Sequence, residues 1–127
     1  MAQLRIRDLY ELLRLAPRRR DLEEDGIRLV YDGAALAMST ADAPSTVIAR
    51  TGTCGFTTGP WELTAYRASI TSTEVWLRIL ITEHGDDLID VSPFWARRPA
   101  EVTFTAGGHT AAFPVIACPS APVDRRP

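Results

Sequence analysis

The sequence predicts a mainly β protein, either an immunoglobulin-like antiparallel β-sandwich or a small barrel, with one N-terminal α-helix. Three observations lead to this prediction. Apolar residues recur at helical spacing only near the N-terminus. From residue 27 onward, short β-branched runs alternate with turn signals about every 8–12 residues, as in sandwiches and barrels. The length of 127 residues and the apolar fraction of 46% suit one soluble domain of ordinary size.

Residues 4–16 form the expected helix. Leu9 and Leu13 lie one turn apart on its apolar face, and Pro17 ends the pattern because the residue before a proline disfavours helical geometry. A densely charged stretch, 18–26, follows and closes on Asp-Gly. This pattern leaves two alternatives open. The helix packs across the β body as part of its core, or it is an arm that docks on a partner, with the charged stretch as its hinge.

Asp32-Gly33 is suited to a two-residue type I′ turn between the first two expected strands, although a short helix over residues 34–37 is a competing interpretation. The alternating run 73–82 is bulky on both faces, which favours a central strand. Residues after Val91 are expected to leave the sheet, because Pro93 cannot donate to a central ladder. A last hairpin turns at Gly107-Gly108. The strands are expected at 27–31, 34–39, 46–51, 61–70, 73–82, 88–91, 101–105 and 110–117.

Three regions follow from these elements. Residues 1–26 are the amphipathic helix and charged hinge, residues 27–118 are the antiparallel β domain, and residues 119–127 are a Pro/Arg tail that we expect to be disordered. The sequence shows no internal repeat and no second domain.

The part of the chain from Trp61 to Val115 resembles bacterial immunoglobulin-like sandwiches. The resemblance depends on the order of its segments: Arg-Ala-x-Ile-Thr at 67–71, an alternating strand at 75–82, Gly85-Asp86, and Leu-Ile-Asp-Val-Ser-Pro-Phe at 88–94. It covers fewer than half of the residues and contains no catalytic motif. It implies a sandwich fold and a role in interaction or assembly, although a shared fold does not by itself carry function.

Composition excludes several classes of function. The chain has 14 Arg, no Lys and no Asn, and its net charge is −2. Without Lys there is no P-loop contact to phosphate and no Schiff-base chemistry, and without net positive charge nucleic acid and anionic lipid are poor partners. No apolar run reaches the ~20 residues that a membrane helix needs. We therefore expect a cytoplasmic protein, and Arg-only basicity with abundant Ala and Pro suggests a GC-rich bacterial genome.

One turn and two isolated side chains could carry chemistry. His84 stands among acids that could hold a cation, His109 follows two glycines at a hairpin tip, and Cys54 could become a nucleophile beside either histidine. Each pattern is also typical of an ordinary solvated turn or a buried cysteine. We therefore assign no catalytic residue, no metal and no cofactor. The acids beside His84 are Glu83, Asp86, Asp87 and Asp90.

The leading hypothesis is a non-enzymatic module that binds another protein or itself. It would use the surface of the β domain together with the N-terminal helix, by groove docking or strand addition. Aromatic and Arg side chains are frequent anchors of protein interfaces. The expected partner-binding residues are Leu9, Leu13, Trp95, Arg97 and Arg98.

Two alternatives stay open. In the first, a small barrel binds an apolar small molecule, as a carrier or as an enzyme that works mainly by shape, because such a pocket needs few motif residues. Its expected lining residues are Tyr31, Trp61, Tyr66 and Trp76. In the second, the chain is a self-assembling structural subunit of the kind found in virions.

Overall fold

The computed structural model describes residues 2–16, 26–40, 46–53, 59–94 and 100–117. Within these ranges the chain forms eight strands and two helices, which confirms the mainly β prediction. In chain order the elements are β1 (Ala2–Arg5), α1 (Ile6–Arg14), β2 (Gly26–Tyr31), β3 (Ala35–Thr40), β4 (Ala49–Gly52), β5 (Trp61–Tyr66), α2 (Arg67–His84), β6 (Leu88–Phe94), β7 (Glu101–Ala106) and β8 (His109–Ala117).

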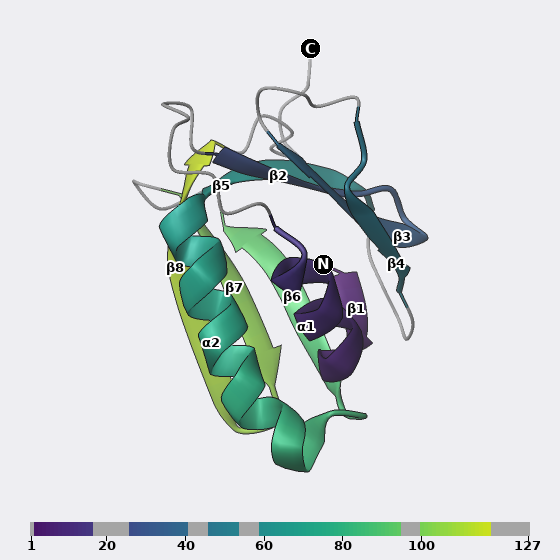
Figure 1. Cartoon of the computed structure of the whole chain (residues 1–127), viewed down its shortest axis with the longest axis vertical. Coiled ribbons are helices and arrows are strands. Elements are labelled where there is room, and N and C mark those ends of the chain that lie inside the picture. The colour runs from purple at the N-terminus through teal and green to yellow at the C-terminus, as the bar shows by residue number, and fades with distance from the viewer. Residues whose placement is uncertain (1, 17–25, 41–45, 54–58, 95–99, 118–127) are drawn as a thin grey trace.

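The described strands join in one open sheet of order β1-β6-β7-β8-β5-β2-β3-β4. All pairs are antiparallel, which confirms that part of the prediction. The structure does not confirm a sandwich of two stacked sheets. Instead the single sheet bends at the short, irregular junction of β5 with β8. In Figure 1 its two halves lie at a steep angle, α1 lies in the space between them, and α2 runs beside β7 and β8.

The fold consists of two interlocked βαβββ units, which the sequence does not reveal. The first is β1-α1-β2-β3-β4 and the second is β5-α2-β6-β7-β8. The first strand of each unit pairs with the second strand of the other, since β1 pairs with β6 and β5 with β2. Each helix begins directly after its strand, behind an extended residue, Arg5 (φ −73°, ψ 146°) or Tyr66 (φ −65°, ψ 142°). Leu9 and Ile70, four residues further on in each unit, are both buried.

The largest error of the sequence prediction concerns α2. The strand expected at 61–70 ends at Tyr66, and the strand expected at 73–82 lies wholly within the helix. The alternation of large residues is real, but tertiary packing overrides a weak strand preference. Within the part of the chain that gave the resemblance to immunoglobulin-like sandwiches, residues 67–84 are therefore helical. The buried positions of α2 follow helical spacing instead: Ser69, Ile70, Thr73, Glu74, Leu77 and Leu80.

Pro93 was expected to end a strand, yet β6 continues through it and pairs Pro93 with Val102. The pairing of β6 with β1 stops where Val91 meets Ala2. Beyond that point no described strand pairs with β6 on this side, and a proline is tolerated where no ladder partner needs its missing N–H. The competing helix over residues 34–37 is also wrong, because β3 begins at Ala35.

The N-terminal helix is confirmed, but it is shorter than expected because residues 2–5 form β1. Leu9 and Leu13 are 0% and 2% exposed and belong to the central core cluster. The apolar face of α1 is thus covered by the chain itself, chiefly by α2, β4 and β1. The expected hinge lies largely, and the expected tail wholly, outside the described residues. In the part that is described, neither helix combines the length and apolar character needed to cross a membrane.

Candidate functional site

Tyr31 and Trp61 lie side by side at the ends of two neighbouring strands. They are direct cross-strand partners of β2 and β5, and their ring centroids are 5.8 Å apart. Both belong to the buried face of the sheet, where Leu29 and Leu63 form the next pair along the strands. The exposed fraction is 0% for Tyr31 and 4% for Trp61. The period of two along each strand therefore turns both aromatic rings inward.

An open groove of about 370 Å³ lies at this end of the two strands. Its volume falls in the range of small-molecule sites, which are mostly apolar with a few polar groups. The lining side chains come from the ends of β2 and β5 and from the residues just beyond them. They are Val30, Tyr31, Asp32, Pro60, Trp61 and Glu62.

Two polar atoms of this pair have no partner among the described residues. Both Tyr31 Oη and Trp61 Nε1 are buried and make no hydrogen bond to any of them. Buried polar groups in folded proteins almost always have a partner, because leaving one without costs about 1–3 kcal/mol. An indole N–H can only donate, whereas a phenol can donate or accept. One acceptor atom, such as a carbonyl oxygen, would be a suitable partner for both.

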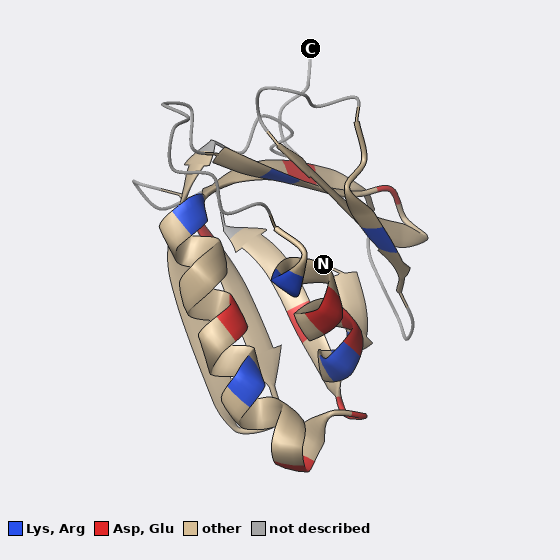
Figure 2. Ribbon diagram, in the orientation of Figure 1, with Lys and Arg blue, Asp and Glu red and all other residues tan. Residues whose placement is uncertain are grey.

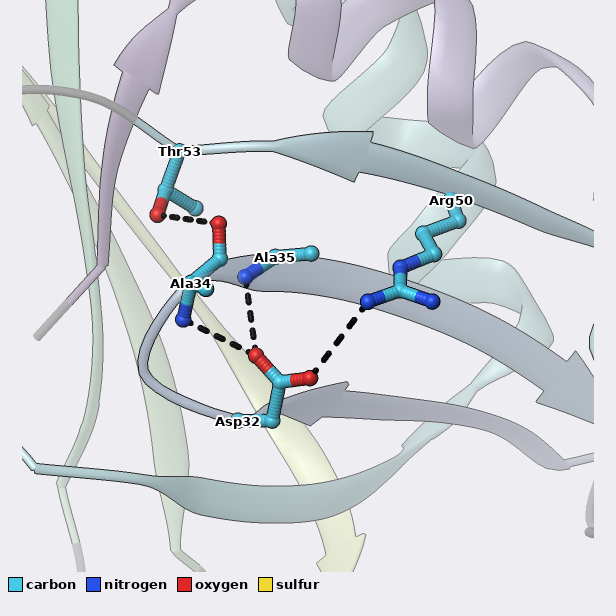
Figure 3. Close-up of polar contacts among 5 residues, drawn as sticks. All are labelled: Asp32, Ala34, Ala35, Arg50 and Thr53. Carbon is cyan, nitrogen blue, oxygen red and sulfur yellow. Dashed lines mark hydrogen bonds and ion pairs between the residues drawn. The ribbon is translucent and has the colours of Figure 1, made fainter.

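The β2–β3 turn forms one rim of the groove, and polar contacts hold it in place (Figure 3). Asp32 Oδ1 accepts hydrogen bonds from the backbone N–H groups of Ala34 and Ala35, both at 2.9 Å. These bonds lower the pKa of the Asp32 carboxyl group, and Arg50, 3.6 Å away, acts in the same direction. Just after β4, the Thr53 hydroxyl donates to the carbonyl oxygen of Ala34 at 3.0 Å. The rim is therefore fixed to the neighbouring strands.

This turn is not the expected type I′ turn. A type I′ turn needs positive φ at both central residues, and among the described residues other than glycine none has it. Gly33 has φ +99°, and the Asp32 N–H donates to the carbonyl oxygen of Ala35 at 3.2 Å. Gly33 and Ala34 are therefore the central residues. Positive φ at the first of them alone is the pattern of a type II′ turn.

The charges around the groove are balanced. Glu62 accepts a hydrogen bond from Arg28 at 3.0 Å, and Asp32 is paired with Arg50. Figure 2 shows both signs of charge on this half of the sheet, with neither sign dominating. A neutral ligand meets no net repulsion here, whereas an anion would meet the two lining carboxylates.

Only two of the four predicted ligand-lining residues meet. Tyr66 lies at the opposite end of β5 and is 45% exposed. Trp76 belongs to α2 and packs near Phe104, with the ring centroids 6.3 Å apart. No sequence signal separated Tyr31 and Trp61 from the other two residues, because all four were predicted only as aromatic side chains that could line a pocket. The missing hydrogen-bond partners could not be read from the sequence.

The acidic cluster predicted around His84 is dispersed in the structure. Asp86 pairs with Arg7 at 3.3 Å, and Asp90 accepts a hydrogen bond from Gln3 at 2.7 Å. Of the acids in the turn after α2, only Asp87 makes a hydrogen bond to the histidine. Across the residues that the structure describes, no three His, Cys, Asp or Glu side chains gather in a way that could hold a metal ion.

Sequence reasoning missed that the two histidines meet. His84 is the last residue of α2, and His109 begins β8; their ring centroids are 5.7 Å apart. Both line a more enclosed pocket of about 100 Å³ at the end of α2. A separation of 25 positions and a turn of two glycines gave no signal of this contact in the sequence.

The predicted partner-binding residues are not assembled into one described surface. Leu9 and Leu13 are in the core, and Trp95, Arg97 and Arg98 lie outside the described residues, as do Cys54 and Cys118.

The chain matches no family model, and no curated protein and no solved structure matches it.

Proposed function

We propose that the protein binds a small, neutral, mostly apolar molecule that carries a hydrogen-bond acceptor. The observation that supports this is the pair of buried, unpartnered polar atoms, Tyr31 Oη and Trp61 Nε1, on residues that line one groove. Burying both atoms without a hydrogen bond to any described residue destabilises the folded protein. A bound acceptor that accepts from both, after a small movement of the two side chains, removes that destabilisation.

The chemistry of the groove narrows the ligand. Val30, Pro60 and the two rings supply apolar contact, while Asp32 and Glu62 at the rim already have Arg partners. An apolar body therefore fits the walls, and a single carbonyl or ether oxygen fits the donors. A carboxylate or phosphate is disfavoured, because it would approach both acids.

Fluorescence titration with a neutral naphthalene ketone such as prodan tests this proposal. Because the ketone oxygen can accept from both donors, Tyr31→Phe and Trp61→Phe should each weaken binding about tenfold, the effect of losing one hydrogen bond. Tyr66→Phe is the matched control, since Tyr66 is exposed and remote from the groove. A naphthalene dye without the ketone should bind more weakly and be indifferent to Tyr31→Phe. Binding of the ketone that neither substitution changes, or no binding of either dye, would contradict the proposal.

A second candidate function is association with a protein, for which we propose a second copy of this chain as the partner. The observation in its favour is the outer face of α2, where Val75 is 45% exposed and Ile79, one turn later, is 70% exposed. A two-fold contact between α2 helices would bury the same residues of both copies. A structural, virion-type subunit would assemble through the same face.

Sedimentation velocity separates the two candidates. Ile79→Arg should convert a dimer to a monomer, and Thr46→Arg, an exposed change outside α2, should have the smaller effect. A monomer at every concentration of the unmodified chain would exclude self-association. Dimerisation that Ile79→Arg leaves intact would place the contact elsewhere.

A further inference from the structure

Beyond the ligand groove, we infer that His84 and His109 bind a transition-metal cation such as Zn²⁺, with Asp87 orienting His84. The site lies where the last residue of α2 meets the β7–β8 turn. The groove lies at the Trp61 end of β5, whereas α2 begins after the other end of that strand. Figure 1 shows the positions of these elements. The site therefore does not depend on the proposed ligand function.

The hydrogen bond to Asp87 prepares His84 to be a ligand. Its Nδ1 lies 3.0 Å from Asp87 Oδ2. Because a carboxylate can only accept, Nδ1 carries the proton, and the lone pair of the neutral ring is on Nε2. Most histidines that ligate metals donate their other N–H to a carboxylate or carbonyl in this way, which fixes the ring and raises its basicity. Asp87 is thus a positioning residue.

His109 faces His84 across the turn. The ring centroids lie 5.7 Å apart with an interplanar angle of 53°, so the rings are tilted rather than stacked. His109 pairs with Ala106 across a tight turn. In this turn Gly107 has φ +58°, a backbone conformation that residues other than glycine rarely adopt. The geometry of the hairpin therefore brings an imidazole to the end of α2.

The pocket that both histidines line has room for a hydrated ion. Its volume is about 100 Å³, while one water occupies about 30 Å³ in the liquid. Apolar side chains and glycine backbone complete the lining: Ile6, Leu80, Ala106, Gly107 and Gly108. The two histidines would supply two ligands, and waters would fill the other positions. This agrees with the finding that the described part of the chain holds no cluster of three ligating side chains.

The surrounding charge favours a cation over an anion. Asp87 lies against one ring nitrogen of His84, and Glu83 Oε1 lies 3.8 Å from the other. Arg7 approaches the same turn, and Asp86 pairs with it at 3.3 Å. Two imidazoles select Zn²⁺, Ni²⁺ or Cu²⁺, whereas Mg²⁺ and Ca²⁺ require oxygen ligands.

Calorimetric titration of the tag-free, full-length chain with Zn²⁺ tests the site. We expect one ion per chain and no heat with Mg²⁺. His84→Ala and His109→Ala should each reduce affinity by more than tenfold, and Asp87→Asn by about tenfold, as is usual when a carboxylate partner of a ligand is lost. Asp86→Asn is the matched control. It removes the same charge from the same turn, but the Asp86 carboxylate pairs with Arg7 and not with a histidine.

Two further measurements make the result decisive. The titration is repeated with Cys54→Ser/Cys118→Ser, since thiolates also bind zinc; an unchanged affinity is expected. Long-range ¹H–¹⁵N spectra of the histidine rings should show Zn²⁺ shifting the Nε2 signal of His84 and leaving its Nδ1 protonated. The inference would be overturned if zinc binding survived in His84→Ala/His109→Ala or disappeared in the cysteine variant. Equal weakening in Asp86→Asn and Asp87→Asn, or no binding at all, would also overturn it.

Discussion

Replacing Tyr31 by Phe should stabilise the protein. The change removes only the hydroxyl group, and the ring stays against Trp61 and the core. In most buried tyrosines this substitution is destabilising because it breaks a hydrogen bond worth about 1 kcal/mol. Tyr31 Oη makes no such bond to the part of the chain that the structure describes, although the side chain is fully buried.

The size of the gain follows from the cost of the unpartnered group. Mutational data put the burial of a hydroxyl without a partner at about 1–3 kcal/mol. We expect the lower end, a gain of about 1 kcal/mol, because Phe leaves a small void where the oxygen was. For a chain of this length that gain corresponds to a rise in Tm of about 4 °C. Urea denaturation monitored by circular dichroism, with an unchanged m value, measures it.

The same variant should lose affinity for a ligand with an acceptor group. A gain in stability together with a loss of binding is the signature of a polar group kept for function rather than for folding. A loss of about 1 kcal/mol of stability in Tyr31→Phe would refute the reasoning, because it would mean that the hydroxyl has a partner within the folded protein. Tyr66→Phe, at an exposed position, should change stability by less than about 0.5 kcal/mol.

Three further expectations concern positions elsewhere in the fold. Leu9→Ala should cost about 2–5 kcal/mol in urea denaturation, as expected for a fully buried leucine; near-native stability would restore the alternative of a docking arm. Gly33→Ala should lower Tm because of the positive φ at that turn, by the equivalent of about 1 kcal/mol, while Gly59→Ala should have little effect. Folding lowers the pKa of Asp32, so the stability it contributes is complete above the ordinary carboxyl pKa of 3.8 and is lost as the pH falls through the lowered folded value. Asp32→Asn should therefore be less stable than the unmodified chain at neutral pH, with the difference shrinking below that value; a difference independent of pH would contradict this assignment.

Sequence patterns correctly predicted the elements that interactions between nearby residues determine. The helix that contains Leu9 and the hairpins at Gly33 and Gly107 were predicted, because amphipathic spacing and turn residues act over a few positions. The strand β1 was missed, since four residues form a strand only by pairing with β6, more than eighty residues away. The helix α2 was mistaken for strands because its outward positions also carry large apolar residues. Val75 and Ile79 on its outer face hide the helical spacing of the buried set.

For the candidate sites, too, the sequence predicted some features and not others. Tyr31 and Trp61 were predicted only as two of four aromatic residues that could line a pocket. Their cross-strand pairing, and the absence of described partners for their polar atoms, depend on the whole surrounding structure. The approach of His84 to His109 results from how α2 lies beside β7 and β8. That packing is a property of the assembled sheet, and no spacing in the sequence encodes it.

The exchange of first strands between the two βαβββ units leads to a last expectation. Because β1 completes the second unit and β5 completes the first, neither unit contains its own full share of the sheet. A fragment of residues 1–57 lacks the partner of β1 and leaves one edge of β2 unpaired, and a fragment of residues 58–127 leaves one edge of β6 unpaired. Each fragment alone should therefore be unfolded by circular dichroism, because unpaired strands and the exposed faces of α1 and α2 cannot form a core.

Mixing the two fragments should restore the β signal of the intact chain with one-to-one stoichiometry, since the pairings β1–β6 and β5–β2 both cross the cut. Leu4→Asp, placed in the buried face of β1, should prevent this recovery, whereas Arg5→Asp, on the exposed side of the same strand, should permit it. If residues 58–127 fold alone with a cooperative transition, β1 is an accessory strand, and the two units are not interlocked energetically even though they are interlocked in space.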